Sequence, residues 1–165
     1  MPTGLLPTPA PLDAEGRALT DPQAVAEAFL HAMAVSDPER ALALVADHIV
    51  YVNVGLPAVR GRAGVAKVLH GLDRPSTSFE VYLHSIAADG PVVLTERTDV
   101  LAFGRFRAQF WVWGRFDVHD GQITLWRDSF DFVDITRSMV RGLVGMVVPS
   151  LRPRPPTDLD APPGR

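Results

Sequence analysis

The chain has 165 residues, of which 47% are hydrophobic, and a formal net charge of −3 at pH 7. That length and apolar content are sufficient for one domain with a sizeable core. Its 16 Lys and Arg residues are scattered, which argues against a nucleic-acid partner. The absence of cysteine excludes disulfides, thiolate metal sites and a cysteine nucleophile. The five histidines show no metal-ligand spacing, so we expect no metal.

Proline marks both ends of the chain as arms outside a folded core. Four prolines lie in residues 1–19 and six in residues 149–165, and these segments lack the apolar content that would offset the entropy lost on ordering. We predict a mobile arm at 1–19, one catalytic domain at 20–148 and a disordered tail at 149–165. No apolar stretch approaches the roughly 20 residues that cross a bilayer, and no basic-then-apolar leader is present. We therefore expect a soluble, cytoplasmic protein without a membrane partner.

Three helices are predicted in the first half of the domain, beginning near residues 20, 36 and 61. The first two each start with a capping residue followed by proline, at Asp21-Pro22 and at residues 37–38. The third spans residues 61–72. Leu30 and Met33 lie on the apolar face of the first helix, and we expect both to contact a bound ligand.

The second half of the domain reads as a sheet closed by a helix. A strand at 48–54 carries Tyr51 and Asn53 on one face, and strands follow at 78–88, 92–101, 106–118 and 122–133. A last helix begins at Asp134, repeats apolar residues at helical spacing and ends before Pro149. Three helices, a curved, mixed but mostly antiparallel sheet and a closing helix describe an α+β domain around a deep apolar pocket.

Two strands carry charged residues on faces that are otherwise apolar. Arg97 and Asp99 share one face of their strand, and Asp128 shares a face with Trp126 and Phe130. A carboxylate on an aromatic face is costly unless a cation or donor meets it, and Arg97 is the obvious partner. Two aspartates that share one arginine supply an acid and a base in one pocket when one of them keeps its proton.

The hairpin before the last strand decides whether Asp128 reaches this pocket. A two-residue loop at Asp120 and Gly121 would place Asp128 opposite Trp113, whereas a three-residue loop would place it opposite Val112. We favour the three-residue loop because it gathers the apolar residues of both strands around Asp128. That apolar wall consists of Phe106, Phe110, Val112, Phe116, Trp126, Phe130 and Phe132.

The two faces of the predicted sheet indicate different partners. On the inner face, Leu101, Phe110, Val112 and Phe130 predict binding of a lipophilic ligand. On the outer face, two tryptophans, at 111 and 113, lie beside arginines, a composition typical of protein interfaces. We therefore place a protein contact on the outer face.

With these residues assembled, the chain resembles the limonene-1,2-epoxide hydrolases, a family with the cone-shaped fold of nuclear transport factor 2. The resemblance covers about residues 22–148. It rests on three separate segments, Tyr51–Asn53 with the loop and Gly61-Arg62 downstream, Thr95–Leu101, and Ile123–Asp131. One departure is that Ser129 follows the second aspartate, where the family usually has tyrosine.

The resemblance implies a one-step addition of water to an epoxide, without a cofactor, that gives a vicinal diol. By resemblance, Asp128 is the general base, and Tyr51 and Asn53 help it to hold the attacking water. Asp99 protonates the epoxide oxygen, and Arg97 bridges the two carboxylates. The family also implies a homodimer, which we place at the outer sheet face. The chemistry agrees, because epoxide opening needs a base at the nucleophile and a proton at the developing alkoxide.

Other functions remain open from the residues alone. Ketosteroid isomerase-like or cyclase-like proton-transfer enzymes share the fold, although they do not need an arginine that links two carboxylates. A non-catalytic module for hydrophobic ligands would use the same cavity but not the charges. A glycosidase could use paired carboxylates, although the apolar wall suits a lipid-like ligand better than a sugar. The order of preference is epoxide hydrolase, then isomerase or cyclase, then binding module.

Overall fold

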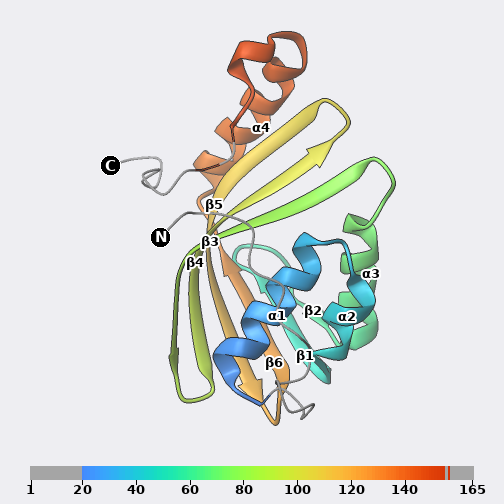
Figure 1. Cartoon of the computed structure of the whole chain (residues 1–165), viewed down its shortest axis with the longest axis vertical. Helices are drawn as coiled ribbons and strands as arrows, with labels where there is room; N and C mark the ends of the chain where they lie inside the picture. The colour runs from blue at the N-terminus through green and yellow to red at the C-terminus, as the bar shows by residue number, and fades with distance from the viewer. Residues whose placement is uncertain (1–19, 155, 157–165) are drawn as a thin grey trace.

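The computed structural model describes residues 20–154 and 156. Three helices lie on one side of a six-stranded sheet, and a fourth helix lies at the other end of the molecule (Figure 1). The predicted arm at 1–19 lies outside the described residues. The strand order is β2-β1-β6-β5-β4-β3, in which only β1 and β6 are parallel. The strands are β1 (Val45–Asn53), β2 (Val59–Arg60), β3 (Thr77–Asp89), β4 (Val92–Phe103), β5 (Phe106–His119) and β6 (Gln122–Ser129). The predicted mixed α+β sheet is confirmed, and β2 is an addition to it.

The first three helices form close to the predicted positions, and capping residues begin the first two. They are α1 (Pro22–Ala34), α2 (Pro38–Ala43) and α3 (Arg62–Leu72). Asp21 and Asp37 accept hydrogen bonds from the backbone N–H groups of Ala24 and Arg40, and proline occupies the first turn of α1 and α2. Each cap satisfies a donor that the helix itself leaves free. β1 begins at Val45, before the predicted start at residue 48, and α2 accordingly ends at Ala43.

The core is organised around aromatic residues that connect α1 with the sheet. Phe29 of α1 is fully buried, and its ring meets Phe116 and Trp126 edge-on at centroid distances of 5.9 and 5.0 Å. Trp126 in turn stacks on Tyr51 at 3.8 Å. Such pairs contribute about 0.5–1.5 kcal/mol each beyond their buried area. These contacts fix α1, β1, β5 and β6 relative to one another.

The β5–β6 hairpin has a different register from the predicted one. Its loop consists of two residues, Asp120 and Gly121, with φ of 51° and 75°, as a type I′ turn requires, so the three-residue loop was wrong. A bulge in β6 then shifts the pairing by one residue, and Asp128 lies opposite Gly114 instead of either predicted partner. Because Gly114 and Val112 share a face, Asp128 still lies on the predicted inner face.

The last helix, α4 (Phe132–Val147), begins earlier than predicted, and among its residues only Ile135, in the first turn, lines the pocket. Asp131 caps it by accepting a hydrogen bond from the backbone N–H of Val133 at 2.7 Å, so the predicted cap at Asp134 was wrong. Accordingly β6 ends at Ser129, short of the predicted 133. Figure 1 shows α4 at the opposite end of the molecule from α1 and α2.

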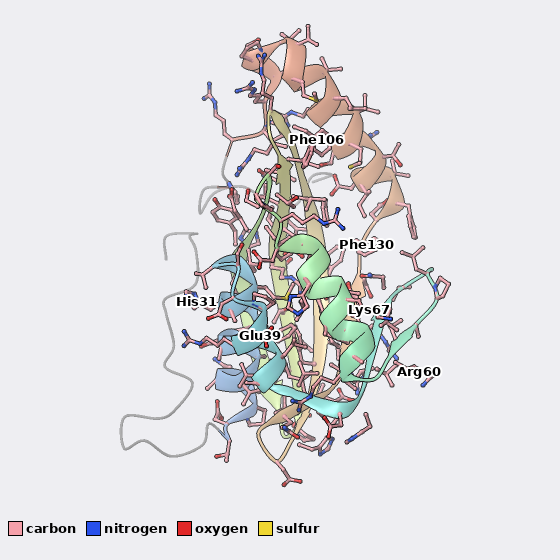
Figure 2. All side chains as sticks on the ribbon, turned by 90° about the vertical axis from the view of Figure 1, so that its right-hand side faces the viewer. His31, Glu39, Arg60, Lys67, Phe106 and Phe130 are labelled. Atoms are coloured by element: carbon pink, nitrogen blue, oxygen red, sulfur yellow. The ribbon has the colours of Figure 1, made fainter. Side chains whose placement is uncertain are left out.

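The position of α4 follows from an open edge on β5. β6 pairs only with the second half of β5, so the backbone of the first half needs another partner on that side. Asp134 and Ser138 of α4 accept hydrogen bonds from the backbone N–H groups of Trp111 and Gln109, at 3.1 and 2.7 Å. Gly142 packs against the backbone of the same strand and against Phe106, which Figure 2 places beside α4.

The polar and small residues of α4 therefore face the sheet, whereas most of its apolar residues after Ile135 do not. The apolar residues that repeat at helical spacing after Ile135 are exposed in the described chain: Met139, Val140, Leu143 and Val147. A short 3-10 helix, η1 (Pro149–Leu151), follows where the disordered tail was predicted to begin. Residues 155 and 157–165 of that tail lie outside the description. Within the described chain, every helix is too short or too polar to cross a membrane.

Candidate active site

A cavity of about 210 Å³ lies between the inner face of the sheet and the helices. Its lining includes five of the predicted ligand-contacting residues, namely Met33, Leu101, Phe110, Val112 and Phe130. Figure 2 shows Phe130 between α3 and the start of α4. Leu30 was also predicted to contact the ligand, but it is fully buried in the core and is not part of the lining. The cavity is thus mainly apolar, as the inner-face residues indicated.

Sequence reasoning missed part of this lining. Val68 and Leu72 of α3, Phe79 of β3 and Ile135 of α4 also face the cavity. Val68 and Leu72 are four residues apart in a helix and therefore share one face of α3. That spacing cannot distinguish a face that lines a cavity from one that fills the core, since packing against other elements decides it.

The charged cluster lies at the wall of the cavity, with Arg97 between the two aspartates. Its Nε and Nη2 atoms donate hydrogen bonds to Asp99 Oδ1 and Oδ2 at 2.9 and 3.2 Å, and Nη2 lies 2.7 Å from Asp128 Oδ1. Arg97, Asp99 and Asp128 are 1%, 4% and 5% exposed. The contact with Asp128 is an ion pair without the geometry of a regular hydrogen bond. Asp128 therefore retains acceptor capacity, whereas both oxygens of Asp99 are engaged by the arginine.

Two residues that sequence reasoning did not single out also surround the guanidinium. Thr95 Oγ1 accepts a hydrogen bond from Arg97 Nη1 at 3.2 Å. Gly114 lies beneath the same nitrogen, and a Cβ atom at that position would be 2.2 Å from it. The signal for Gly114 was present in the sequence, because a glycine inside a strand of bulky residues often marks a close approach of another group.

β1 brings the other two predicted polar residues to Asp128. Asn53 is the partner of Asp128 in the parallel β1–β6 pair, and its Nδ2 donates a hydrogen bond to the Tyr51 hydroxyl oxygen at 2.7 Å. The hydroxyl proton of Tyr51 is therefore available for another acceptor. Stacking on Trp126 fixes the tyrosine ring. The structure thus brings the five predicted polar residues together at one site: Tyr51, Asn53, Arg97, Asp99 and Asp128.

Burial and charge together determine where protons lie in the cluster. Burial raises the pKa of Asp99 to about 6, although Arg97 acts in the opposite direction, and the charge of Asp128 raises it further. Burial lowers the pKa of Arg97, but the two aspartates outweigh it and raise the pKa above the ordinary value. Burial, and then the charge of Asp128, raises the pKa of Tyr51 above its ordinary range. The site thus combines a carboxyl that can hold a proton, a permanent cation and a phenol donor.

This arrangement is suited to moving two protons at once. Asp99 can donate a proton at one side of the guanidinium, while Asp128 can accept one at the other side.

Within residues 20–154 and 156, no group of three or more His, Asp and Glu residues could hold a metal ion.

Comparisons with known proteins place this site in context. The family model for the limonene-1,2-epoxide hydrolase catalytic domain matches residues 20–141. The epoxide hydrolase EphG of Mycobacterium tuberculosis is 49% identical over 126 residues, which are 76% of this chain and 84% of EphG. The structure of an LEH-like epoxide hydrolase from M. tuberculosis has a TM-score of 0.78 and 46% identity, covering 82% of this chain and 96% of that one. A nuclear transport factor 2-like protein from Burkholderia pseudomallei shares the fold alone, with 14% identity, a TM-score of 0.63 and coverage of 73% and 98%.

Asp99 should make the stability of the fold decrease as pH rises. Its pKa is about 6 in the folded protein and ordinarily 3.8, so between these values the folded state keeps a proton that the unfolded chain releases. The free energy of unfolding should therefore fall by up to ~3 kcal/mol over this range, because one pKa unit corresponds to about 1.4 kcal/mol. Urea unfolding of the wild type and Asp99→Asn should show their difference in stability decreasing from pH ~4 to pH ~7. A constant difference would contradict the raised pKa.

Proposed function

Because the chain belongs to the limonene-1,2-epoxide hydrolase family and is an epoxide hydrolase, we propose that it adds water directly to a lipophilic epoxide in one step. The product is a vicinal diol, and no ester between enzyme and substrate forms. The observation that carries this proposal is the buried Arg97, which contacts both Asp99 and Asp128 beside an apolar cavity. Burial of two carboxylates around a single cation favours a state in which one is protonated and the other is ionised, because the one positive charge cannot offset both negative charges away from water.

Asp99 is the proposed general acid. It donates its proton to the epoxide oxygen as the carbon–oxygen bond breaks, so that a hydroxyl forms instead of an alkoxide. Burial, which raises the pKa of Asp99 to about 6, supports this role by favouring the protonated form closer to neutrality. The guanidinium of Arg97, which already donates to both Asp99 oxygens, stabilises the carboxylate that remains.

Asp128 is the proposed general base. It accepts a proton from a water molecule while the oxygen of that water attacks an epoxide carbon. The acceptor capacity of Asp128 that Arg97 leaves unused supports this role, and Tyr51 and Asn53 lie next to it, where they can orient the water. Each turnover moves one proton onto Asp128 and removes one from Asp99. The cluster must therefore transfer a proton between the aspartates, or exchange with solvent, before the next turnover.

The cavity lining supports a lipophilic substrate. Met33, Leu101, Phe110, Val112 and Phe130 offer no hydrogen-bonding side chain, and the polar groups gather at the charged cluster. A substrate with many hydroxyl groups would leave them unpaired against this lining, which is unfavourable. An epoxide carried on a terpene-, fatty-acid- or sterol-like skeleton fits the chemistry of the cavity better.

We also propose that the protein forms a homodimer through the outer face of its sheet. Leu94 of β4 and Trp113 of β5 lie on that face and are about half exposed. Trp111 lies on the same face, where it stacks on His84 at a centroid distance of 4.5 Å. Aromatic residues in such positions are typical of interface centres.

Replacement of either aspartate should abolish turnover without unfolding the protein. Asp99→Asn and Asp128→Asn keep the size of the side chain but remove the acid or the base, and each should lower kcat by at least ~100-fold. Diol formation from a panel of lipophilic epoxides measures the effect, with circular dichroism to verify the fold. Asp117→Asn is the matched control, since Asp117 pairs with Arg115 on the outer face. Near-normal activity of Asp128→Asn would remove the proposed base.

A single-turnover reaction in ¹⁸O-labelled water, with enzyme in excess, should place the label in the diol at the first turnover. Direct attack by water transfers solvent oxygen to carbon, whereas attack by an enzyme carboxylate would first transfer an unlabelled carboxylate oxygen. Mass spectrometry of the diol distinguishes the two. Unlabelled diol would disprove the one-step mechanism, and a panel that yields no diol would contradict the lipophilic substrate class.

The dimer should dissociate when the outer face is made charged. In sedimentation velocity, Trp113→Glu should shift the protein from dimer to monomer, because it buries a charge at the proposed contact. Leu143→Glu is the matched control, since Leu143 is comparably exposed but lies on α4. Dissociation by Leu143→Glu alone would place the contact on α4 and contradict the proposal.

A further inference from the structure

We propose that Thr95 and Gly114 are positioning residues that hold the guanidinium of Arg97 between the two aspartates and thereby determine which aspartate carries the proton. Neither residue lines the cavity, so both act through Arg97 and not on the substrate. The inference rests on the proposed function in one respect, namely that proton transfer by Asp99 and Asp128 performs the reaction.

The sheet register explains why such a device is needed. Arg97 lies on β4 and Asp128 on β6, and β5 runs between these strands. Thr95, Gly114 and Asp128 form one row across the three strands, because Gly114 is the partner of both other residues. The Arg97 side chain starts one inner-face position away, opposite Val112, and must pass over β5 to reach Asp128.

Gly114 supplies the space for this crossing. A Cβ atom at residue 114 would lie 2.2 Å from Arg97 Nη1, 2.5 Å from Thr95 Oγ1 and 3.3 Å from Asp128 Oδ1. Any side chain would therefore occupy the place of the guanidinium. Glycine costs conformational entropy in a strand and contributes no packing, so its position at the centre of the cluster indicates a steric requirement.

Thr95 fixes the orientation of the guanidinium in that space. The hydrogen bonds from Nε and Nη2 to Asp99 leave Nη1 on the far side, where Thr95 Oγ1 accepts from it at 3.2 Å. Thr95 is itself buried. Without the hydroxyl, a buried cationic donor would lose its acceptor, and the guanidinium would turn toward another oxygen.

A displaced guanidinium would change the proton distribution of the cluster. The titratable groups that face Asp99 are Arg97 on its own strand, Asp128 on β6 and Tyr51 on β1. Of these, only Arg97 lowers the pKa of Asp99. Its displacement should therefore raise that pKa and move the alkaline limb of the pH–rate profile to higher pH.

The test compares Thr95→Val, Thr95→Ser and Gly114→Ala in the full chain with a lipophilic epoxide that the wild type hydrolyses. Thr95→Val keeps the shape of the side chain and removes the hydroxyl. It should lower kcat about tenfold or more, since a small misplacement of a catalytic group has effects of this size, and should change KM by less than about twofold. It should also move the alkaline limb of kcat/KM upward by at least ~0.5 pH units. Thr95→Ser restores the acceptor and should restore both properties.

The matched control is Thr98→Val. Thr98 is also a buried threonine of β4, but it lies on the outer face, where its Oγ1 is 2.8 Å from His84 Nε2. Its replacement should leave kcat and the pH profile unchanged.

The Gly114→Ala variant should lose most of the activity. If Gly114→Ala does not fold, the Thr95→Val variant still decides the question.

An NMR titration of the Asp99 carboxyl carbon, without substrate, separates this inference from the proposed function. The midpoint should rise in Thr95→Val and return to the wild-type value in Thr95→Ser. Wild-type midpoint and kcat in Thr95→Val, or equal impairment in Thr95→Ser, would overturn the positioning role. A wild type that hydrolyses no epoxide would contradict the proposed function, while the titration would still decide whether Thr95 positions Arg97.

Discussion

A buried arginine shared by two carboxylates is the interaction on which this structure depends. Arg97, Asp99 and Asp128 are almost fully removed from solvent, and each would be very unfavourable there alone. Together they satisfy one another, but one positive charge cannot neutralise two negative ones. Burial therefore favours a proton on one aspartate, and the pKa of Asp99 rises to about 6. The same constraint that makes the cluster compatible with the interior supplies it with a carboxyl that can hold a proton.

The sheet topology makes this cluster possible. The three charged residues come from β4 and β6, and glycine at position 114 of the intervening β5 lets the guanidinium cross. The parallel pairing of β1 with β6 brings Asn53 next to Asp128, and the Tyr51 ring is held against Trp126. The helices α1 and α3 complete an apolar cavity against which the charged groups are concentrated. The apolar cavity and the charged cluster thus lie on the same sheet face.

Much of the site could be predicted because it depends on local periodicity. Arg97 and Asp99 are two residues apart in a strand, so they share a face whatever the strand pairs with. The partner of Asp128 could not be predicted, because hairpin register depends on the loop and on a bulge that leaves no clear sequence signal. The inner-face position of Asp128 was nevertheless correct, since the bulge and the shorter loop together preserve the alternation of faces.

The sequence by itself determined the order of the main elements and the strand faces that carry the polar residues, because caps, turn residues and two-residue alternation act over a few positions. The resemblance of three separate segments identified the family. Only the tertiary structure decided that α4 covers the edge of β5 and that Leu30 belongs to the core and not to the cavity. It also decided that Thr95 and Gly114 surround the guanidinium. These features arise from contacts between segments far apart in the chain, and no pattern within a single segment specifies its partner.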